Sequence, residues 1–299
     1  MNRLRNDRGQ AAVLTVIFLV ALLGAVAMVL DVGSWFRAQR STQTGADAAA
    51  LAAAHGLPES PGTANALATE YLGKNGGGTA VVTFSSKNVA NDTVTVKVTR
   101  QAPGVFSKIF GINSVEVHAK AAARSGNPDQ ARWAAPIAVD IKHPLLQCKP
   151  LPCFGTATTL DLEKVGPGAF RLLNLDGSKG GTGSQNLAVW ITQGFDGYMP
   201  LGWYGSDPGA KFNSSNVKAA MNFKLGDELL FPIYDQITGG GANFQYHVVG
   251  WVGFIVTDFT AKGNGGTVDG HFVRVIWEGI QSTSGANGDF GVRAIELVE

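Results

Sequence analysis

Residues 11–56 read AAVLTVIFLVALLGAVAMVLDVGSWFRAQRSTQTGADAAALAAAHG and combine two kinds of helix-forming sequence. The first part, Ala11–Leu30, carries no charge, and a helix of its length spans roughly 30 Å, the thickness of the hydrocarbon core of a bilayer. Seven of the nine residues from Ala46 to Ala54 are alanine, the residue with the highest helix propensity. The pattern predicts one long helix that ends at His55, because Gly56 is a typical stop signal.

Ala11–Leu30 is predicted to cross a bacterial cell membrane once. Arg3, Arg5 and Arg8 precede it, and the positive-inside rule therefore places the N-terminus in the cytoplasm. No later segment is long and apolar enough for a second span, so the bulk of the chain is expected to be extracytoplasmic. The alternative is a secretory signal cleaved after Ala25-Val26-Ala27. A retained anchor is favoured, because a signal usually has an apolar region of about 7–15 residues and because the helical pattern here continues beyond the span.

A small α+β module is predicted after the long helix. Gly62–Gly73 has the pattern of a short helix, and three alternating, β-branched segments are typical of half-buried strands: Thr79–Ser85, Thr93–Arg100 and Ser114–Ala122. The predicted domain boundaries are a cytoplasmic N-terminus (1–10), a transmembrane helix (11–30), an Ala-rich stalk helix (31–56), the α+β module (57–124), a polar linker (125–133) and a β-rich extracytoplasmic domain (134–299).

The distal domain is predicted to be mainly antiparallel β-structure, either a sandwich or a barrel. Its apolar and β-branched segments are separated by glycine-rich turns, and few long helical patterns occur among them. The strand candidates are Ala134–Asp140, Thr158–Lys164, Glu228–Tyr234, Gln245–Thr257, Gly270–Gln281 and Gly291–Val298.

The N-terminal segment resembles the TadE/TadG-like proteins of tight-adherence (Flp-type) pilus assembly. The resemblance is carried by Arg8-Gly9-Gln10-Ala11-Ala12, Asp31-Val32-Gly33, Phe36, Arg40, Gln43 and the alanine run Ala46–Ala54. The later segment Gly104–Ala123 is similar to the strand-rich part that comes next in such proteins. The resemblance implies a membrane-anchored pseudopilin or minor-pilin-like component. Its implied partners are other pilus-assembly subunits, membrane platform proteins and, through residues 11–30, the lipid bilayer.

Two features of the family's relatives are missing from this sequence. No acidic residue follows Gly9 at the fifth position, where prepilin peptidase substrates of the pilin type carry one. The chain also lacks the Asp-x-Ser-x-Ser run of metal-dependent adhesion domains. Neither processing at Gly9 nor a metal-dependent adhesive mechanism is therefore carried over.

The alanine-rich helix is predicted to present a close-packing surface. Ala46, Ala49, Ala50 and Ala53 share one face by their spacing of three and four, whereas Ala48 and Ala52 lie largely on another. Small side chains allow neighbouring backbones to approach closely. Bundling of pilin-like subunits or docking on the chain's own distal domain would use this face, and a spacer helix is the alternative.

Residues that carry chemistry are few. Cys148 and Cys153, in CKPLPC, are the two cysteines, and a disulfide between them is favoured over free thiols outside the cytoplasm. The histidines at 55, 118, 143, 247 and 271 lack metal-type spacing, so no metal and no cofactor are predicted. No nucleophile motif occurs, and Asp227-Glu228 would serve a hydrolase only beside a further carboxylate. No catalytic residue is assigned.

Three functions of different classes are consistent with these observations. A structural subunit of pilus assembly is favoured over an anchored surface-binding module, and an envelope hydrolase ranks third. The binding module would use the aromatic side chains Trp190, Tyr198, Trp203 and Tyr204, for which core packing is the alternative. A net charge of +1 gives no general attraction to nucleic acid, and no nucleic-acid partner is predicted.

Overall fold

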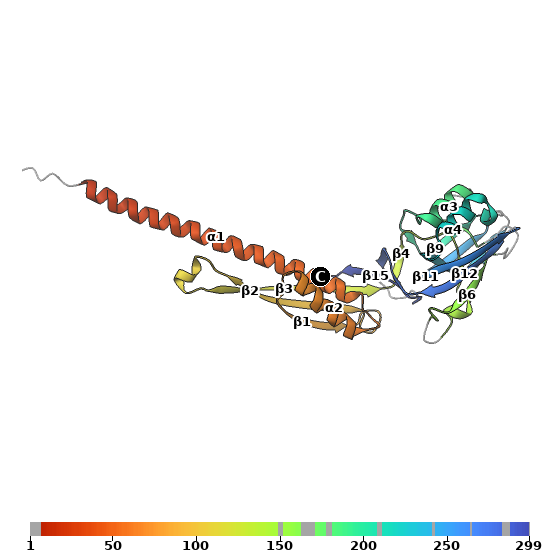
Figure 1. The fold of residues 1–299 in the computed structure, drawn as a ribbon, viewed down its shortest axis with the longest axis horizontal. Helices are drawn as coiled ribbons and strands as arrows, with labels where there is room; N and C mark the ends of the chain where they lie inside the picture. Colours follow the sequence, from red (N-terminus) through yellow and green to blue (C-terminus); the bar gives the residue numbers. More distant parts are fainter. Residues whose placement is uncertain are drawn as a thin grey trace, which may run out of the picture. The chain divides into compact units, whose positions relative to one another are not determined.

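The structure is a computed structural model that describes residues 7–148, 152–162, 171–177, 181–207, 211–240, 243–263, 265–282 and 288–298 (Figure 1). The chain forms two compact units. The first unit comprises Met1–Lys87, Asn91–Arg124 and Leu297–Glu299, and the second comprises Asn88–Ala90 and Ser125–Glu296.

The first unit begins with α1 (Asp7–Ala54), a single continuous helix. It confirms the long helix predicted from the apolar run and the alanine run. Consecutive turns come after its end and lead into α2 (Pro61–Lys74). α2 approaches the first of these turns so closely that a Cβ on Gly56 would lie 2.8 Å from the backbone nitrogen of Ala64, which explains the glycine at this position. The Ser60 side chain caps α2 by accepting a hydrogen bond from the backbone N–H of Thr63 (3.4 Å).

Three strands complete the first unit. β1 (Thr79–Ser85), β2 (Thr93–Pro103) and β3 (Ser114–Gly126) form an antiparallel meander, in which Val82 pairs with Val96 and Val96 with Ala121. A 3₁₀ turn, η1 (Ser107–Phe110), lies in the loop between β2 and β3. The sheet face formed by alternate residues of β2 is buried, as the period of two predicts.

The second unit is organised around a bent, mainly antiparallel sheet. Its strands run in the order β5 (Val139–Asp140), β10 (Glu228–Thr238), β11 (Gln245–Lys262), β12 (Gly265–Val273) and β6 (Ala157–Asp161). Only β5 and β10 pair in parallel within this order. β9 (Gly202–Ser206) pairs with β11, and β7 (Leu173–Asn174) pairs with β9. This confirms the predicted β-rich distal domain.

Short strands and turns add to this sheet. β4 (Pro128–Ala131) pairs with β14 (Gly279–Gln281) and β8 (Met199–Pro200), and β13 (Val275–Ile276) pairs in parallel with β15 (Val292–Leu297). The 3₁₀ turns η2 (Pro144–Leu146) and η3 (Lys211–Asn213) lie in the connections.

Two helices in the second unit were missed by the sequence analysis. α3 (Ser184–Thr192) and α4 (Ser215–Phe223) lie on one side of the sheet (Figure 1). Their buried residues, Leu187 and Ile191 of α3 and Met221 of α4 among them, belong to the same core as the aromatic side chains of the sheet. Each helix has nine residues, which is too short for a distinct helical pattern in a glycine-rich sequence.

Several predicted segments need correction. Residues 125–133 are not a polar linker, since β3 ends at Gly126 and β4, which begins two residues later, pairs on both edges. The helical part of 31–56 does not stand free as a stalk, because its C-terminal half packs against α2 and β2. Among the strand candidates, the one predicted over residues 134–140 is a regular strand only at Val139–Asp140, and the one predicted over residues 270–281 is divided among β12, β13 and β14.

Candidate functional site

The N-terminal half of α1 presents apolar side chains to the surroundings. Large apolar residues from Val13 to Leu30 are about half exposed or more. In the part of the chain that the structure describes, this is the one helix long and apolar enough to cross a membrane, and its most apolar window has a mean hydropathy of 3.0 with none of it buried. A soluble protein would bury such a surface, so the exposed band indicates a membrane anchor.

The predicted alanine face is buried inside the first unit. Ala46, Ala49, Ala50 and Ala53 are all 0% exposed, and the helix that carries them contacts α2 and β2. The absence of bulky side chains lets the two helices lie close together: a Cβ on Gly45 would lie 3.2 Å from the carbonyl oxygen of Asn75. These contacts lie within the chain. The face therefore acts in the packing of the first unit.

Polar side chains of α1 bind the edge of β3. Gln43 Nε2 donates to the carbonyl oxygen of Lys120 (3.0 Å) and to Asp47 Oδ1 (2.7 Å). One turn earlier, Gln39 Nε2 donates to the carbonyl oxygen of His118 (2.5 Å). Gln43 belongs to the family-like pattern, and the structure shows what it does: it fixes the helix to the sheet.

Asp31, at the end of the apolar band, holds the loop between β2 and β3. Its buried carboxylate accepts hydrogen bonds from the backbone N–H groups of Val105 (3.0 Å), Phe106 (3.0 and 3.2 Å) and Ser107 (2.5 Å). Burial by itself raises the pKa of this carboxyl. The hydrogen bonds from Ser107, Val105 and Phe106 outweigh burial and lower the pKa of Asp31 to about 2. The ionised Asp31 carboxylate therefore holds the β2–β3 loop against α1 at the end of the apolar band.

The four aromatic residues proposed as ligand contacts divide into two pairs. Trp190 and Tyr204 are 8% and 9% exposed and belong to the core of the second unit, as the packing alternative predicted. Burial raises the pKa of Tyr204 to about 12, and its hydroxyl donates to the carbonyl oxygen of Pro200 (2.6 Å). Tyr198 and Trp203 are each 46% exposed. Of the four, these two alone are accessible to a ligand.

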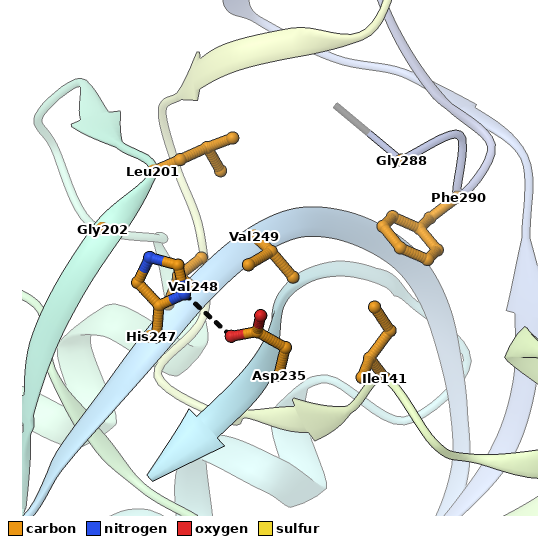
Figure 2. A pocket seen from close by; sticks show the side chains of 9 residues that line it. All are labelled: Ile141, Leu201, Gly202, Asp235, His247, Val248, Val249, Gly288 and Phe290. Atoms are coloured by element: carbon orange, nitrogen blue, oxygen red, sulfur yellow. Dashed lines mark hydrogen bonds and ion pairs between the residues drawn. The ribbon is translucent and has the colours of Figure 1, made fainter. Parts of the chain in front are cut away.

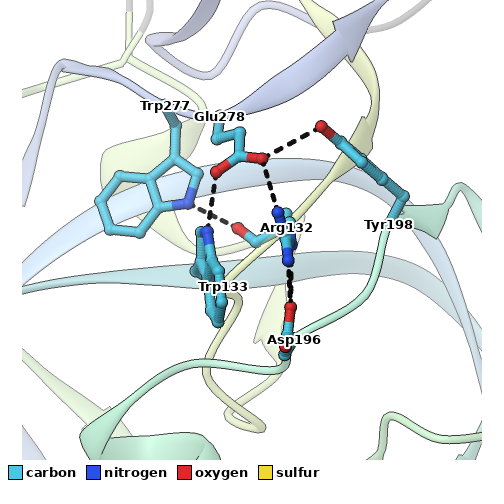
Figure 3. A network of polar contacts seen from close by, with 6 residues as sticks. All are labelled: Arg132, Trp133, Asp196, Tyr198, Trp277 and Glu278. Atoms are coloured by element: carbon cyan, nitrogen blue, oxygen red, sulfur yellow. Dashed lines mark hydrogen bonds and ion pairs between the residues drawn. The ribbon is translucent and has the colours of Figure 1, made fainter.

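Tyr198 belongs to a polar network on the second unit (Figure 3). Glu278 is its centre: the carboxylate accepts hydrogen bonds from Trp133 Nε1 (2.8 Å), Arg132 Nη1 (3.0 Å) and the Tyr198 hydroxyl (3.0 Å). Arg132 also pairs with Asp196, through Nε at 3.0 Å and through a second, shorter contact from Nη2. These hydrogen bonds, the one from Trp133 foremost, lower the pKa of Glu278.

The same network fixes the backbone of the predicted linker. Trp133 has a positive φ of 61°, which is uncommon for a bulky residue, and its N–H donates to the carbonyl oxygen of Phe195 (2.9 Å). The Arg132 guanidinium lies 4.3 Å from the centre of the Trp133 ring, and Trp277 Nε1 donates to the Arg132 carbonyl oxygen (2.7 Å). These contacts hold the backbone at residues 132–133.

Trp203 lies next to a shallow pocket of the second unit. Its ring centre is 4.9 Å from that of His247. His247 Nδ1 lies 2.8 Å from Asp235 Oδ1, and Figure 2 marks this contact in the pocket. The pocket has a volume of about 350 Å³, and the remaining side chains that line it are apolar: Ile141, Leu201, Val248, Val249 and Phe290. No hydroxyl or thiol occurs among the described lining residues. Among these described residues, the polar groups are the imidazole and the carboxylate, and the rest of the lining offers an apolar surface.

Cys148 and Cys153 form the predicted disulfide, with their Cα atoms 5.6 Å apart. The backbone N–H of Cys153 donates to the carbonyl oxygen of Leu145 (2.8 Å), which ties the disulfide loop to η2. His143 caps η2, since its Nδ1 accepts from the backbone N–H of Leu145 (3.2 Å). Burial and, to a lesser extent, the charge of Arg171 lower the pKa of His143. Both cysteines and His143 therefore have structural partners.

Asp227 and Glu228, the two acids considered for a hydrolase, have different surroundings. Asp227 pairs with Lys224 (3.1 Å), and burial raises the pKa of Glu228 at the start of β10. Within the described ranges, no group of three or more His, Cys, Asp or Glu side chains is placed to hold a metal ion.

The geometry defines a class of protein. Its members have an apolar N-terminal helix, and the part of the helix beyond the apolar band packs onto a small α+β unit. Residues 9–56 match the family model of Flp pilus-assembly TadE/G-like proteins. The match coincides with α1 and the turn after it, which confirms the resemblance seen in the sequence and supports a role in Flp pilus assembly. No curated protein and no solved structure matches the chain.

Proposed function

We propose that the chain is a membrane-anchored pseudopilin or minor-pilin-like component of Flp pilus assembly, and that its role is structural rather than catalytic. The observation that carries the proposal is the coincidence of the family match, residues 9–56, with a helix whose two halves have different surroundings. The first half has its apolar side chains exposed, and the second half is bound into the first unit. Such a helix fixes the position of the first unit relative to the membrane, as a subunit of an envelope assembly requires.

The proposed topology rests on the charges before the helix. Arg3, Arg5 and Arg8 are expected in the cytoplasm, and both units are expected outside it. Partners within the membrane are expected to be other pilus-assembly subunits and platform proteins, as well as lipid.

Deletion of the gene, followed by electron microscopy of Flp pili on the cell surface, tests the function. We expect the deletion to remove or strongly reduce pili and the full chain to restore them. A chain in which residues 11–30 are replaced by an unrelated apolar span of equal length is the informative variant. It should keep the anchor and the fold but restore fewer pili. Normal piliation in the deletion strain would contradict the proposal.

A surface-binding module is the second candidate, and one observation favours it: the exposed indole of Trp203 beside the pocket with His247 and Asp235. Binding of the purified full chain to isolated cell-wall material tests it. Trp203→Ala should weaken binding, whereas Phe223→Ala, at a 71% exposed position on α4, should not. Equal binding by both variants and the unmodified chain would remove this candidate.

A further inference from the structure

The loop that joins β2 and β3 exposes apolar side chains in place of the polar residues usual at a hairpin tip. Val105, Ile109 and Phe110 are 63%, 82% and 80% exposed, and Ile112 is also exposed. The loop, Gly104–Ile112, carries one charged residue, Lys108, whose side chain is exposed as well. A contiguous apolar surface of this kind marks an interaction site.

The loop lies directly beside the apolar band of α1. A groove of about 630 Å³ separates them, lined on one side by Gly24, Ala27 and Met28 of α1 and on the other by Phe106, Phe110 and Ile112 of the loop. Asp31 fixes this arrangement through its hydrogen bonds to residues 105–107. The loop therefore has a defined level along the helix.

That level reaches the C-terminal end of the predicted span. From Gly24 to the end of the span at Leu30, the helix rises about 9 Å. Phe106, Phe110 and Ile112 line the same groove as Gly24 and Met28, so the loop reaches the level of the last turns of the 11–30 span. Trp35 lines the far end of the groove, at a position where interfacial aromatic residues are enriched.

Seven backbone N–H groups of the loop have partners within the chain, which favours burial in lipid, where each polar group needs an internal partner. The N–H groups of Val105, Phe106 and Ser107 donate to Asp31. Four more N–H groups donate to carbonyl oxygens within the hairpin: Gly104 to Asn113 (2.9 Å), Ile109 to Phe106 (3.0 Å), Gly111 to Lys108 (3.0 Å) and Ile112 to Ser107 (3.1 Å).

We propose that the tip of the β2–β3 hairpin, residues 104–112, is a second membrane contact, inserted among the lipids beside the C-terminal end of the α1 span. The apolar side chains face acyl chains, and the Lys108 ammonium extends to the phosphate groups of the lipids. Two contacts set the angle and rotation of the first unit above the bilayer, which a single helix does not. The inference rests on α1 spanning the membrane through residues 11–30.

Site-directed fluorescence in lipid vesicles tests the inference. Ile109→Cys is labelled with an environment-sensitive fluorophore in the full chain, whose two native cysteines are held in a disulfide. The chain is reconstituted into vesicles of phosphatidylethanolamine and phosphatidylglycerol that carry a nitroxide on the acyl chain near the headgroup. We expect blue-shifted emission, strong quenching by the lipid nitroxide and protection from aqueous iodide.

Two matched labels make the outcome decisive. Val81→Cys, at an exposed position of β1 beside Gln43, lies about 18 Å further along the helix than Asp31 and should show the opposite pattern. Val20→Cys, within the span, should be protected from iodide and quenched by a nitroxide placed deep in the acyl chain.

If the label at 20 is protected but the label at 109 behaves like that at 81, the hairpin inference is overturned while the anchor stands. Exposure of the label at 20 removes the anchor and the inference with it. A label at 109 that is shielded from iodide but not quenched by lipid indicates a protein neighbour and also overturns the inference.

Discussion

At the residue scale, the Asp31 carboxylate makes the stability of the first unit depend on pH. Its pKa is lowered from 3.8 to about 2 in the folded chain, so it is the ionised form that stabilises the fold. The contribution is complete above the unfolded pKa and is lost as pH falls from about 4 towards 2. Loss of this contribution should release the loop that Asp31 holds.

We predict that Asp31→Asn weakens the loop at neutral pH and removes this pH dependence, because the neutral amide places donors opposite the N–H groups of residues 105–107. Hydrogen exchange of these amides, corrected for intrinsic rates, measures the effect in detergent. The unmodified chain should lose protection on acidification in the stated window, and the variant should start with less protection and change little. Identical pH profiles would show that the carboxylate does not hold the loop.

The disulfide gives a second prediction at this scale. Closure of a short loop by Cys148–Cys153 restricts the unfolded chain, and for a loop of about six residues the chain-entropy estimate is about 2 kcal/mol. Cys148→Ser with Cys153→Ser should lower the free energy of unfolding by about that amount. Denaturant unfolding with and without a reducing agent measures it. The reducing agent should affect the unmodified chain alone, and equal sensitivity of the double variant would contradict the assignment.

At the element scale, α1 depends on small side chains over its C-terminal half. Ala49 and Ala53 are fully buried against α2 and β2, whereas Ala48, on the same helix, is partly exposed. Ala52, predicted to lie largely off the packing face, is only 8% exposed. The helix is therefore covered over a wider arc than the spacing of three and four indicated.

We predict that Ala49→Leu lowers the free energy of unfolding of the first unit by about 1–3 kcal/mol, because the larger side chain overpacks the contact with α2 and β2. Ala48→Leu is the matched control, since leucine nearly equals alanine in helix propensity and the site has space. Hydrogen exchange of the amides of α2 reports on the first unit alone. If both variants destabilise equally, the burial of Ala49 is not what limits side-chain size.

At the scale of the whole molecule, the arginines before the span and the two units after it predict the topology. A protease applied to intact cells with the outer envelope layers removed should degrade both units and leave a protected fragment that contains the N-terminus and the span. An epitope tag at the N-terminus identifies that fragment by immunoblotting. Protection of both units in intact cells would show the opposite orientation.

Several features could be predicted from the sequence because they depend on neighbouring residues. The apolar run and the alanines predict helix α1. Alternating β-branched residues predict strand β2, and a run of apolar residues predicts strand β11. The disulfide joins two cysteines five positions apart in one short loop. The helices α3 and α4 escaped prediction because their short segments become helical only when the sheet core covers their apolar faces.

The long N-terminal helix, its apolar first half and its resemblance to the TadE/G-like segment could all be recognised from the residues of that segment alone. These properties depend on local propensity and on the period of the apolar side chains. The folded structure was needed to show that Asp31 holds the β2–β3 loop, that Glu278 fixes residues 132–133, and which two of the four aromatic residues are exposed. The first two depend on groups at least 74 positions apart in the chain, and in a single sequence nothing marks such groups as neighbours until the fold brings them together.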